Sequence, residues 1–170
     1  MRRLPLLLTL ILGCAIQRAT PPAPASPPPL IVRPISEVLF NDCLPCYTSK
    51  HGIVVVVMPD GECPPQAEFD AAITEVFKDA KIRRSRMTVL KGTSVVFVPA
   101  VVEFLGDPIV GLTLGDWLVI VTTNVEHIPW RGTLKHEVLH ALKWHYGRKP
   151  DADHEDPRYL LYDSEHLFRD

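Results

Sequence analysis

The sequence predicts an α+β fold, in which a small twisted mixed sheet with a backing helix is followed by a second helix. Short β-branched runs and one long amphipathic segment alternate between residues 53 and 123. After residue 130 the apolar residues recur with a helical period, and this segment contains the run His136-Glu137-Val138-Leu139-His140. We therefore expect a strand, a helix, several strands, and then the helix that carries this run.

The predicted strands are β-branched stretches bounded by turn residues. Residues 53–58 form a continuous apolar run that ends at Pro59-Asp60-Gly61, as expected for a buried strand. Further strand candidates are residues 87–90, residues 94–104 with an interruption at Pro99, residues 109–114 and residues 117–123. Gly115 and Asp116 lie between the last two candidates and predict a two-residue hairpin turn.

The backing helix is predicted to begin after Pro64 and Pro65. Its apolar residues recur every three or four positions, at Phe69, Ala72, Ile73, Val76, Phe77 and Ala80. This spacing forms one stripe along a helix, so we expect these side chains to pack in the core rather than to form a site.

The N-terminal part of the chain is predicted to lie outside the folded domain. Arg2 and Arg3 precede an apolar run over residues 4–12, which is too short to span a bilayer and has the form of a signal-peptide core. We assign residues 1–13 to a signal peptide and residues 14–35 to a proline-rich, semi-rigid tether. Residues 36–170 then form a single domain, long enough for one core, which we expect to be monomeric.

The order Ile11-Leu12-Gly13-Cys14 resembles a bacterial lipoprotein signal. The resemblance implies that Cys14 is lipidated and that the exported domain is anchored to the membrane of the cell envelope. Ala15 follows the cysteine, which by the same resemblance favours the outer over the inner membrane. The alternative is an ordinary cleaved signal or a short uncleaved anchor, in which Cys14 has no special role.

The charge of the chain argues against one class of partner. Eighteen Lys and Arg residues face twenty Asp and Glu residues, which gives a formal net charge of −2. We find no basic stripe and no block of like charge in the sequence, so we expect no nucleic-acid partner.

Three cysteines remain in the predicted domain: Cys43, Cys46 and Cys63. In an exported chain their expected use is structural, with one disulfide joining Cys63 to Cys43 or to Cys46. The odd count leaves one thiol free. Pairing of Cys43 with Cys46 is the third arrangement, and the sequence does not choose among them.

The run from His136 to His140 has the spacing of a metal-binding helix. Histidines four residues apart project about 40° from each other on one helical face, so both imidazoles can reach a single metal ion. Glu137 lies beside that face, where it could take a proton from a metal-bound water instead of ligating. The alternative is an ordinary amphipathic helix with solvated histidines.

The motif and the order of elements resemble the catalytic domain of zincin metallopeptidases, and most closely the matrixin-like metzincins. The resemblance is strong over residues 130–142 and only architectural over residues 53–123. It implies a zincin-like fold, a Zn²⁺ cofactor and a peptide or protein substrate. It also implies His136 and His140 as ligands and Glu137 as the general base. In this family an edge strand binds extended substrate, a role that falls to the hairpin of residues 109–123.

The third ligand departs from the family pattern. Metzincins place a glycine three residues after the second histidine and the third histidine three residues later, and these positions are Lys143 and Tyr146 here. We favour His154, because Asp156-Pro157 and Leu161-Tyr162 follow it much as acidic residues, proline and a Met-turn follow the family's third histidine. The other candidates are His145, Glu165 and His166.

Three further side chains bear on this site. His145 lies about 180° around the helix from His136, so we expect it on the core side as a structural histidine. Lys143 falls near the histidine face and must point outward or pair with a carboxylate such as Asp151 or Asp153. Tyr162 is a candidate oxyanion donor, and its alternative role is that of a packed aromatic residue.

Two functions follow from the sequence. The first is an envelope-tethered zinc metallopeptidase, in which zinc activates a water molecule and Glu137 accepts its proton. The second is a non-catalytic envelope lipoprotein that keeps a zincin-like fold and serves as a binding module. The irregular third ligand keeps the second alternative open, whereas Glu137 favours the first, because a structural zinc site needs no base.

Overall fold

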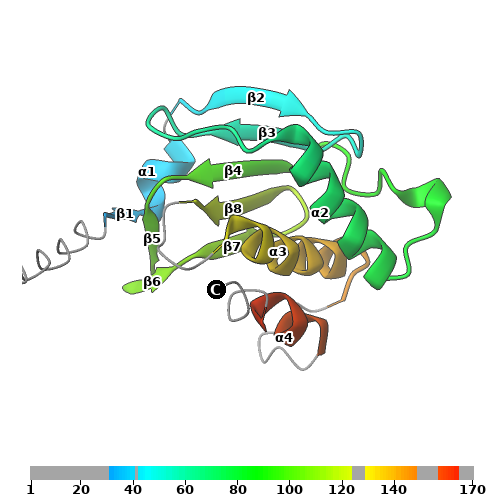
Figure 1. The fold of residues 1–170 in the computed structure, drawn as a ribbon. Coiled ribbons are helices and arrows are strands. Elements are labelled where there is room, and N and C mark those ends of the chain that lie inside the picture. Colours follow the sequence, from blue (N-terminus) through cyan, green and yellow to red (C-terminus); the bar gives the residue numbers. More distant parts are fainter. Residues whose placement is uncertain (1–30, 41, 124–128, 149–156, 165–170) are drawn as a thin grey trace, which may run out of the picture.

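The structure, a computed structural model, describes residues 31–40, 42–123, 129–148 and 157–164. Over these ranges the chain is a mixed α+β fold with two small mixed sheets (Figure 1). The helices are α1 (Ile35–Phe40), α2 (Gln66–Asp79), α3 (Trp130–His145) and α4 (Pro157–Ser164), with a short 3-10 helix η1 (Arg84–Arg86) after α2.

The larger sheet has five strands in the order β2-β3-β4-β8-β7. These strands are β2 (Leu44–Thr48), β3 (Val54–Val57), β4 (Ser94–Val98), β8 (Leu118–Thr122) and β7 (Gly111–Leu114). The three central strands run parallel, whereas β2 and β7 are antiparallel to their neighbours at the two edges. The central strands are almost wholly apolar, as expected for parallel strands that are covered on both faces.

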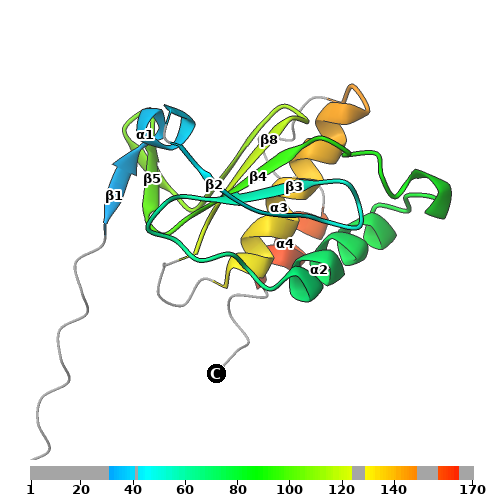
Figure 2. The same ribbon diagram turned by 90° about the horizontal axis from the view of Figure 1, so that it is seen from above.

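Each face of the larger sheet has its own core. In β4, Val95 and Phe97 pack with the buried side chains of α2, α3 and α4, because alternate residues of a strand point to opposite faces. Val96 and Val98 of the same strand pack in a second cluster with Val38 of α1. This second cluster includes residues of the smaller sheet, which has the order β1-β5-β6: β1 (Val32–Pro34), β5 (Val101–Phe104) and β6 (Asp107–Ile109). Figure 2 shows α2, α3 and α4 together on one side of the larger sheet.

Most predicted elements are confirmed. The run at residues 53–58 forms β3, and the helix after Pro65 is α2, with five of its six predicted stripe residues fully buried. The interruption at Pro99 separates β4 from β5. The hairpin of β7 and β8 is also present, but Leu114 pairs with Leu118, so its loop has three residues and Gly115 adopts a φ of 65°.

The strand predicted at residues 87–90 is wrong. This stretch follows η1 and forms successive turns, with the N–H of Val89 donating to the carbonyl of Arg86 and that of Lys91 donating to Thr88. These local bonds satisfy backbone N–H groups that would otherwise require the carbonyl groups of a neighbouring strand. Within this stretch, the side chain of Leu90 packs in the core.

The folded region also begins earlier than residue 36. Val32–Pro34, which we assigned to the end of the tether, pairs in parallel with residues 101–103. Arg33 also pairs with Asp60, across 27 residues of sequence. Residues 1–13 and most of the tether lie outside the described residues. Among the residues that the structure describes, no helix is long and apolar enough to cross a membrane.

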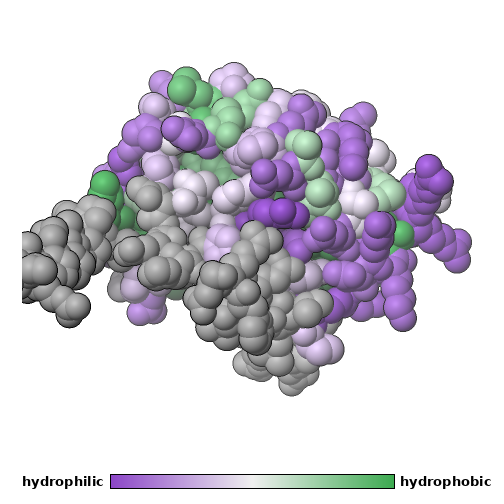
Figure 3. Space-filling view, in the orientation of Figure 1, coloured by the Kyte–Doolittle hydropathy of each residue, from purple (hydrophilic) through white to green (hydrophobic). Residues whose placement is uncertain are grey.

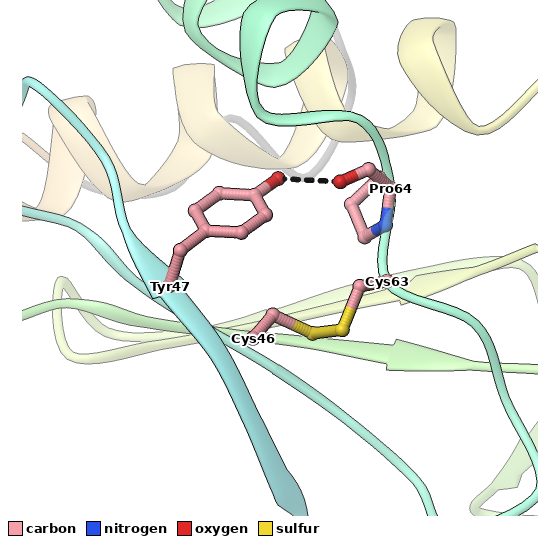
Figure 4. The surroundings of a disulfide bond; sticks show 4 residues. All are labelled: Cys46, Tyr47, Cys63 and Pro64. Carbon is pink, nitrogen blue, oxygen red and sulfur yellow. Dashed lines mark hydrogen bonds between the residues drawn. A yellow bond between two sulfur atoms is a disulfide. The ribbon is translucent and has the colours of Figure 1, made fainter.

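A disulfide joins Cys46 to Cys63, one of the three pairings that the sequence left open (Figure 4). It ties β2 to the loop before α2, and the neighbouring Tyr47 hydroxyl donates to the Pro64 carbonyl at 2.9 Å. Burial, with a smaller contribution from Asp70, raises the pKa of Tyr47 to about 12. Cys43 is a free thiol, and its pKa is raised by burial and by the negative charge of Asp42.

Candidate functional site

Helix α3 is fixed along its length by packing and at its end by a glycine. Its buried apolar residues face α2 and the larger sheet, and include Leu134, Val138 and Leu142. At its C-terminus Gly147 adopts a φ of 66°, and the N–H of Arg148 donates to the carbonyl of Lys143 at 2.9 Å. This Schellman arrangement ends the helix. The histidines of the motif therefore project from a rigid element.

The two histidine side chains converge on one point. The Nε2 atoms of His136 and His140 are 3.2 Å apart, and their ring centroids are 5.0 Å apart. Two imidazole nitrogens that bind one tetrahedral zinc at about 2.0–2.1 Å lie roughly 3.3–3.4 Å from each other. The pair thus has the separation that two ligands of a single metal ion require.

Tyr159 of α4 contacts both histidines, and sequence reasoning missed it. The side chain is fully buried, and its hydroxyl oxygen lies 2.9 Å from Nδ1 of His140. Its ring centroid is 4.6 Å from that of His140 and 4.7 Å from that of His136. If His140 held a metal through Nε2, its Nδ1 would carry the proton and donate to the tyrosine oxygen, which would fix the ring and its tautomer.

Glu137 lies on the other side of the motif, beneath the edge strand β7. Its side chain is buried, with 8 % of the residue exposed, and Oε2 accepts a hydrogen bond from Oγ1 of Thr113 at 2.7 Å. Gly111 leaves space for the carboxylate, because a Cβ at this position would lie 2.6 Å from Oε1 of Glu137. The sequence holds no local signal for either contact, since β7 precedes α3 by a strand and a loop.

Lys143 points toward the site and not away from it. Its Nζ lies 4.7 Å from the centroid of the Tyr159 ring, within the range of a cation–π interaction. The two carboxylates that we considered as its partners, Asp151 and Asp153, lie outside the described residues.

Two expectations about neighbouring residues change. His145 is exposed and not on the core side, and its Nδ1 lies 3.0 Å from Oδ2 of Asp116 in the hairpin loop. The last turn of α3 lies beside this hairpin loop. The side of the helix that carries His145 therefore faces the loop and solvent, and not the core. The segment compared with a Met-turn is the helix α4, where Tyr162 is buried and donates its hydroxyl to Oδ2 of Asp79 at 2.9 Å. This bond ties α4 to the end of α2.

The remaining predicted site residues lie outside the part of the chain that the structure describes. They are His154, Glu165, His166 and Cys14. Within the described ranges, no group of three or more His, Cys, Asp or Glu residues is placed to hold a metal ion. Among the described side chains, His136 and His140 are thus the two candidate metal ligands.

Comparisons of the chain with protein-family models, with curated proteins and with solved structures gave no match.

Proposed function

We propose that the chain is a zinc-dependent metallopeptidase of the zincin type, tethered to the cell envelope through Cys14. The observation that carries the proposal is the convergence of His136 and His140, whose Nε2 atoms are 3.2 Å apart on a rigid helix. His154 is the proposed third ligand, on the sequence pattern alone. Bound zinc would supply Lewis-acid chemistry, which activates water and polarises a carbonyl group.

The chain's own residues divide the remaining roles. His140 is oriented by Tyr159, whose hydroxyl holds Nδ1 at 2.9 Å. Glu137 is the proposed general base, and the hydroxyl of Thr113 restrains its carboxylate. In this role Glu137 would accept a proton from the attacking water and pass it to the leaving amine.

The edge strand β7 is the proposed binding site for substrate. It pairs with β8 on one side, and among the described strands it pairs with no other. An extended peptide can add to such an edge through main-chain hydrogen bonds. Because β7 packs against α3, a peptide on this edge would lie near Glu137.

A second candidate is a non-catalytic binding module with the same fold. The burial of Glu137 and its bond to Thr113 favour this alternative, because a carboxylate used only for packing would be held in the same way. The zinc peptidase remains the better proposal, since a packing role for Glu137 does not explain the convergent pair of histidines beside it.

The test is cleavage of a peptide library by the full-length chain, compared with Glu137→Gln. The variant keeps the shape of the side chain and removes its basicity, so we expect it to retain zinc and lose at least a hundredfold in kcat. Gln66→Glu, an exposed change at the start of α2, is the control and should behave as the wild type. Equal cleavage by the wild type and Glu137→Gln would exclude the proposed base.

A further inference from the structure

A pocket of about 410 Å³ opens where the C-terminal ends of α2 and α3 meet the start of α4. Its base is apolar and includes Ile82, Leu139 and Leu142. The described residues of its wall include no acid and six cations: Lys81, Arg83, Arg86, Lys143, Arg148 and Arg158. In Figure 3, hydrophilic side chains gather at the right, where α2 ends and the following loop begins.

The fold brings these basic residues together, although the sequence showed no basic stripe. They come from three separate stretches, so no window of the sequence contains the cluster. Four of them, Lys81, Arg83, Arg86 and Arg148, form no ion pair with any side chain in the described ranges. Their charge is thus directed to the pocket and to solvent.

The negative C-terminal ends of the helix dipoles balance only a small part of this positive charge. Cations are favoured near helix C-termini, and two such termini lie at the pocket. Each terminus is equivalent to about half a negative charge, so the two together balance about one of the four positive charges on Lys81, Arg83, Arg86 and Arg148.

One of the cations occupies a strained backbone position. Lys81 has a φ of 55° at the end of α2, and the N–H of the next residue, Ile82, donates to the carbonyl of Phe77 at 2.8 Å. This is the position that Gly147 occupies at the end of α3, and a glycine adopts it without the strain that a lysine incurs. A strained residue that is not glycine often indicates a functional role, and here its side chain lines the pocket.

The pocket lies next to the histidine pair. Lys143 belongs to its wall, and the Lys143 ammonium lies over the ring of Tyr159, which contacts both His136 and His140. Two contacts, of 4.7 Å and 4.6 Å, therefore link Lys143 to His140 through the Tyr159 ring. Two or three residues of an extended peptide, at about 3.3–3.6 Å each, have a comparable length.

We propose that this pocket binds a carboxylate of the peptide substrate, two or three residues from the bond that is cleaved. The carboxylate belongs either to a Glu or Asp side chain or to the free C-terminus. Arginine is suited to this ligand because its planar guanidinium donates two parallel hydrogen bonds to a carboxylate. The apolar base would receive the methylene groups of the same residue. This inference rests on the proposed function, since it assigns the pocket to the substrate.

The test measures binding of fluorescent ten-residue peptides by anisotropy, with the full-length chain carrying Glu137→Gln so that the peptides stay intact. One peptide has a single Glu and a free C-terminus, and its counterparts carry Gln or a C-terminal amide. We expect removal of the recognised carboxylate to weaken binding about tenfold, and high salt to reduce this difference. The Gln and amide peptides together identify which carboxylate the pocket recognises.

Matched variants assign the effect to the pocket. Arg83→Gln/Arg86→Gln should abolish the preference for the carboxylate, whereas Lys50→Gln/Lys91→Gln removes the same charge from exposed residues elsewhere and should keep it. Lys81→Gly should raise the Tm and still weaken binding of the acidic peptide. This combination separates loss of the ligand contact from loss of the fold.

Three results would overturn the inference. The first is equal binding of all the peptides, and the second is equal loss of the preference in both double variants. The third is binding of anionic phospholipid vesicles, but not of peptides, that depends on Arg83 and Arg86. Failure of the proposed function has a different signature, since the zinc-loaded wild type would then cleave none of the peptides.

Discussion

The hydroxyl of Tyr159 offers a direct test of how the histidine pair is held. Tyr159→Phe keeps the ring, and with it the contacts to His136, His140 and Lys143, but removes the oxygen that lies 2.9 Å from Nδ1 of His140. Loss of such an outer partner typically weakens metal binding by 10- to 100-fold, which corresponds to roughly 1.4–2.7 kcal/mol. We expect zinc affinity to fall within this range.

Tyr162→Phe is the matched control for this variant. It removes a tyrosine hydroxyl from the same helix, but one that donates to Asp79 at 2.9 Å. We expect it to lower the free energy of unfolding by roughly 1.5–3 kcal/mol, as for a hydrogen bond to a charged group, with zinc affinity unchanged. The assays are competition with a chromophoric chelator and urea unfolding of the metal-free chain. Unchanged zinc affinity in Tyr159→Phe, or an equal loss in Tyr162→Phe, would refute the reasoning.

Four further predictions test other contacts. Gly111→Ala introduces a Cβ only 2.6 Å from Oε1 of Glu137, so kcat should fall at least tenfold while zinc content is kept; wild-type kcat would contradict the placement of Glu137. Cys46→Ala/Cys63→Ala opens a bridge that spans 17 residues and should cost about 3 kcal/mol in urea unfolding, whereas Cys43→Ala should cost far less. Lys81→Gly relieves a φ of 55° and should raise the free energy of unfolding by about 1 kcal/mol; a decrease would show that the backbone there is not strained. Because the pKa of Tyr47 is raised to about 12, its contribution to stability is complete below about pH 10 and is lost between pH 10 and 12, a decline that should be absent in Tyr47→Phe.

The elements with a strong local pattern could be predicted from the sequence. The valine run of β3, the stripe of α2 and the motif on α3 each depend on residues within a few positions of one another. The stretch at residues 87–90 could not, because a short, largely apolar run fits both a strand and a series of turns. The position of His145 could not be predicted either. A helical angle gives the direction of a side chain, but it does not show whether core, loop or solvent lies in that direction.

The second layer of the site depends on contacts between distant parts of the chain. Tyr159 meets His140 across 19 residues, and Thr113 meets Glu137 across 24. Neither tyrosine nor threonine carries a pattern that indicates such a partner. The basic pocket is also a product of the fold, since it joins the ends of α2 and α3 to the start of α4. Local pattern could therefore predict that the two histidines lie on one helix, but not which residues contact them.

The central claim is that His136 and His140 hold one zinc ion, and elemental analysis of the full-length chain tests it most directly. We predict one zinc per chain in the wild type and in Glu137→Gln, and loss of zinc in His136→Ala and in His140→Ala with the fold retained by circular dichroism. A folded wild type without zinc after equilibration with the metal would contradict the account, as would stoichiometric zinc in either histidine variant.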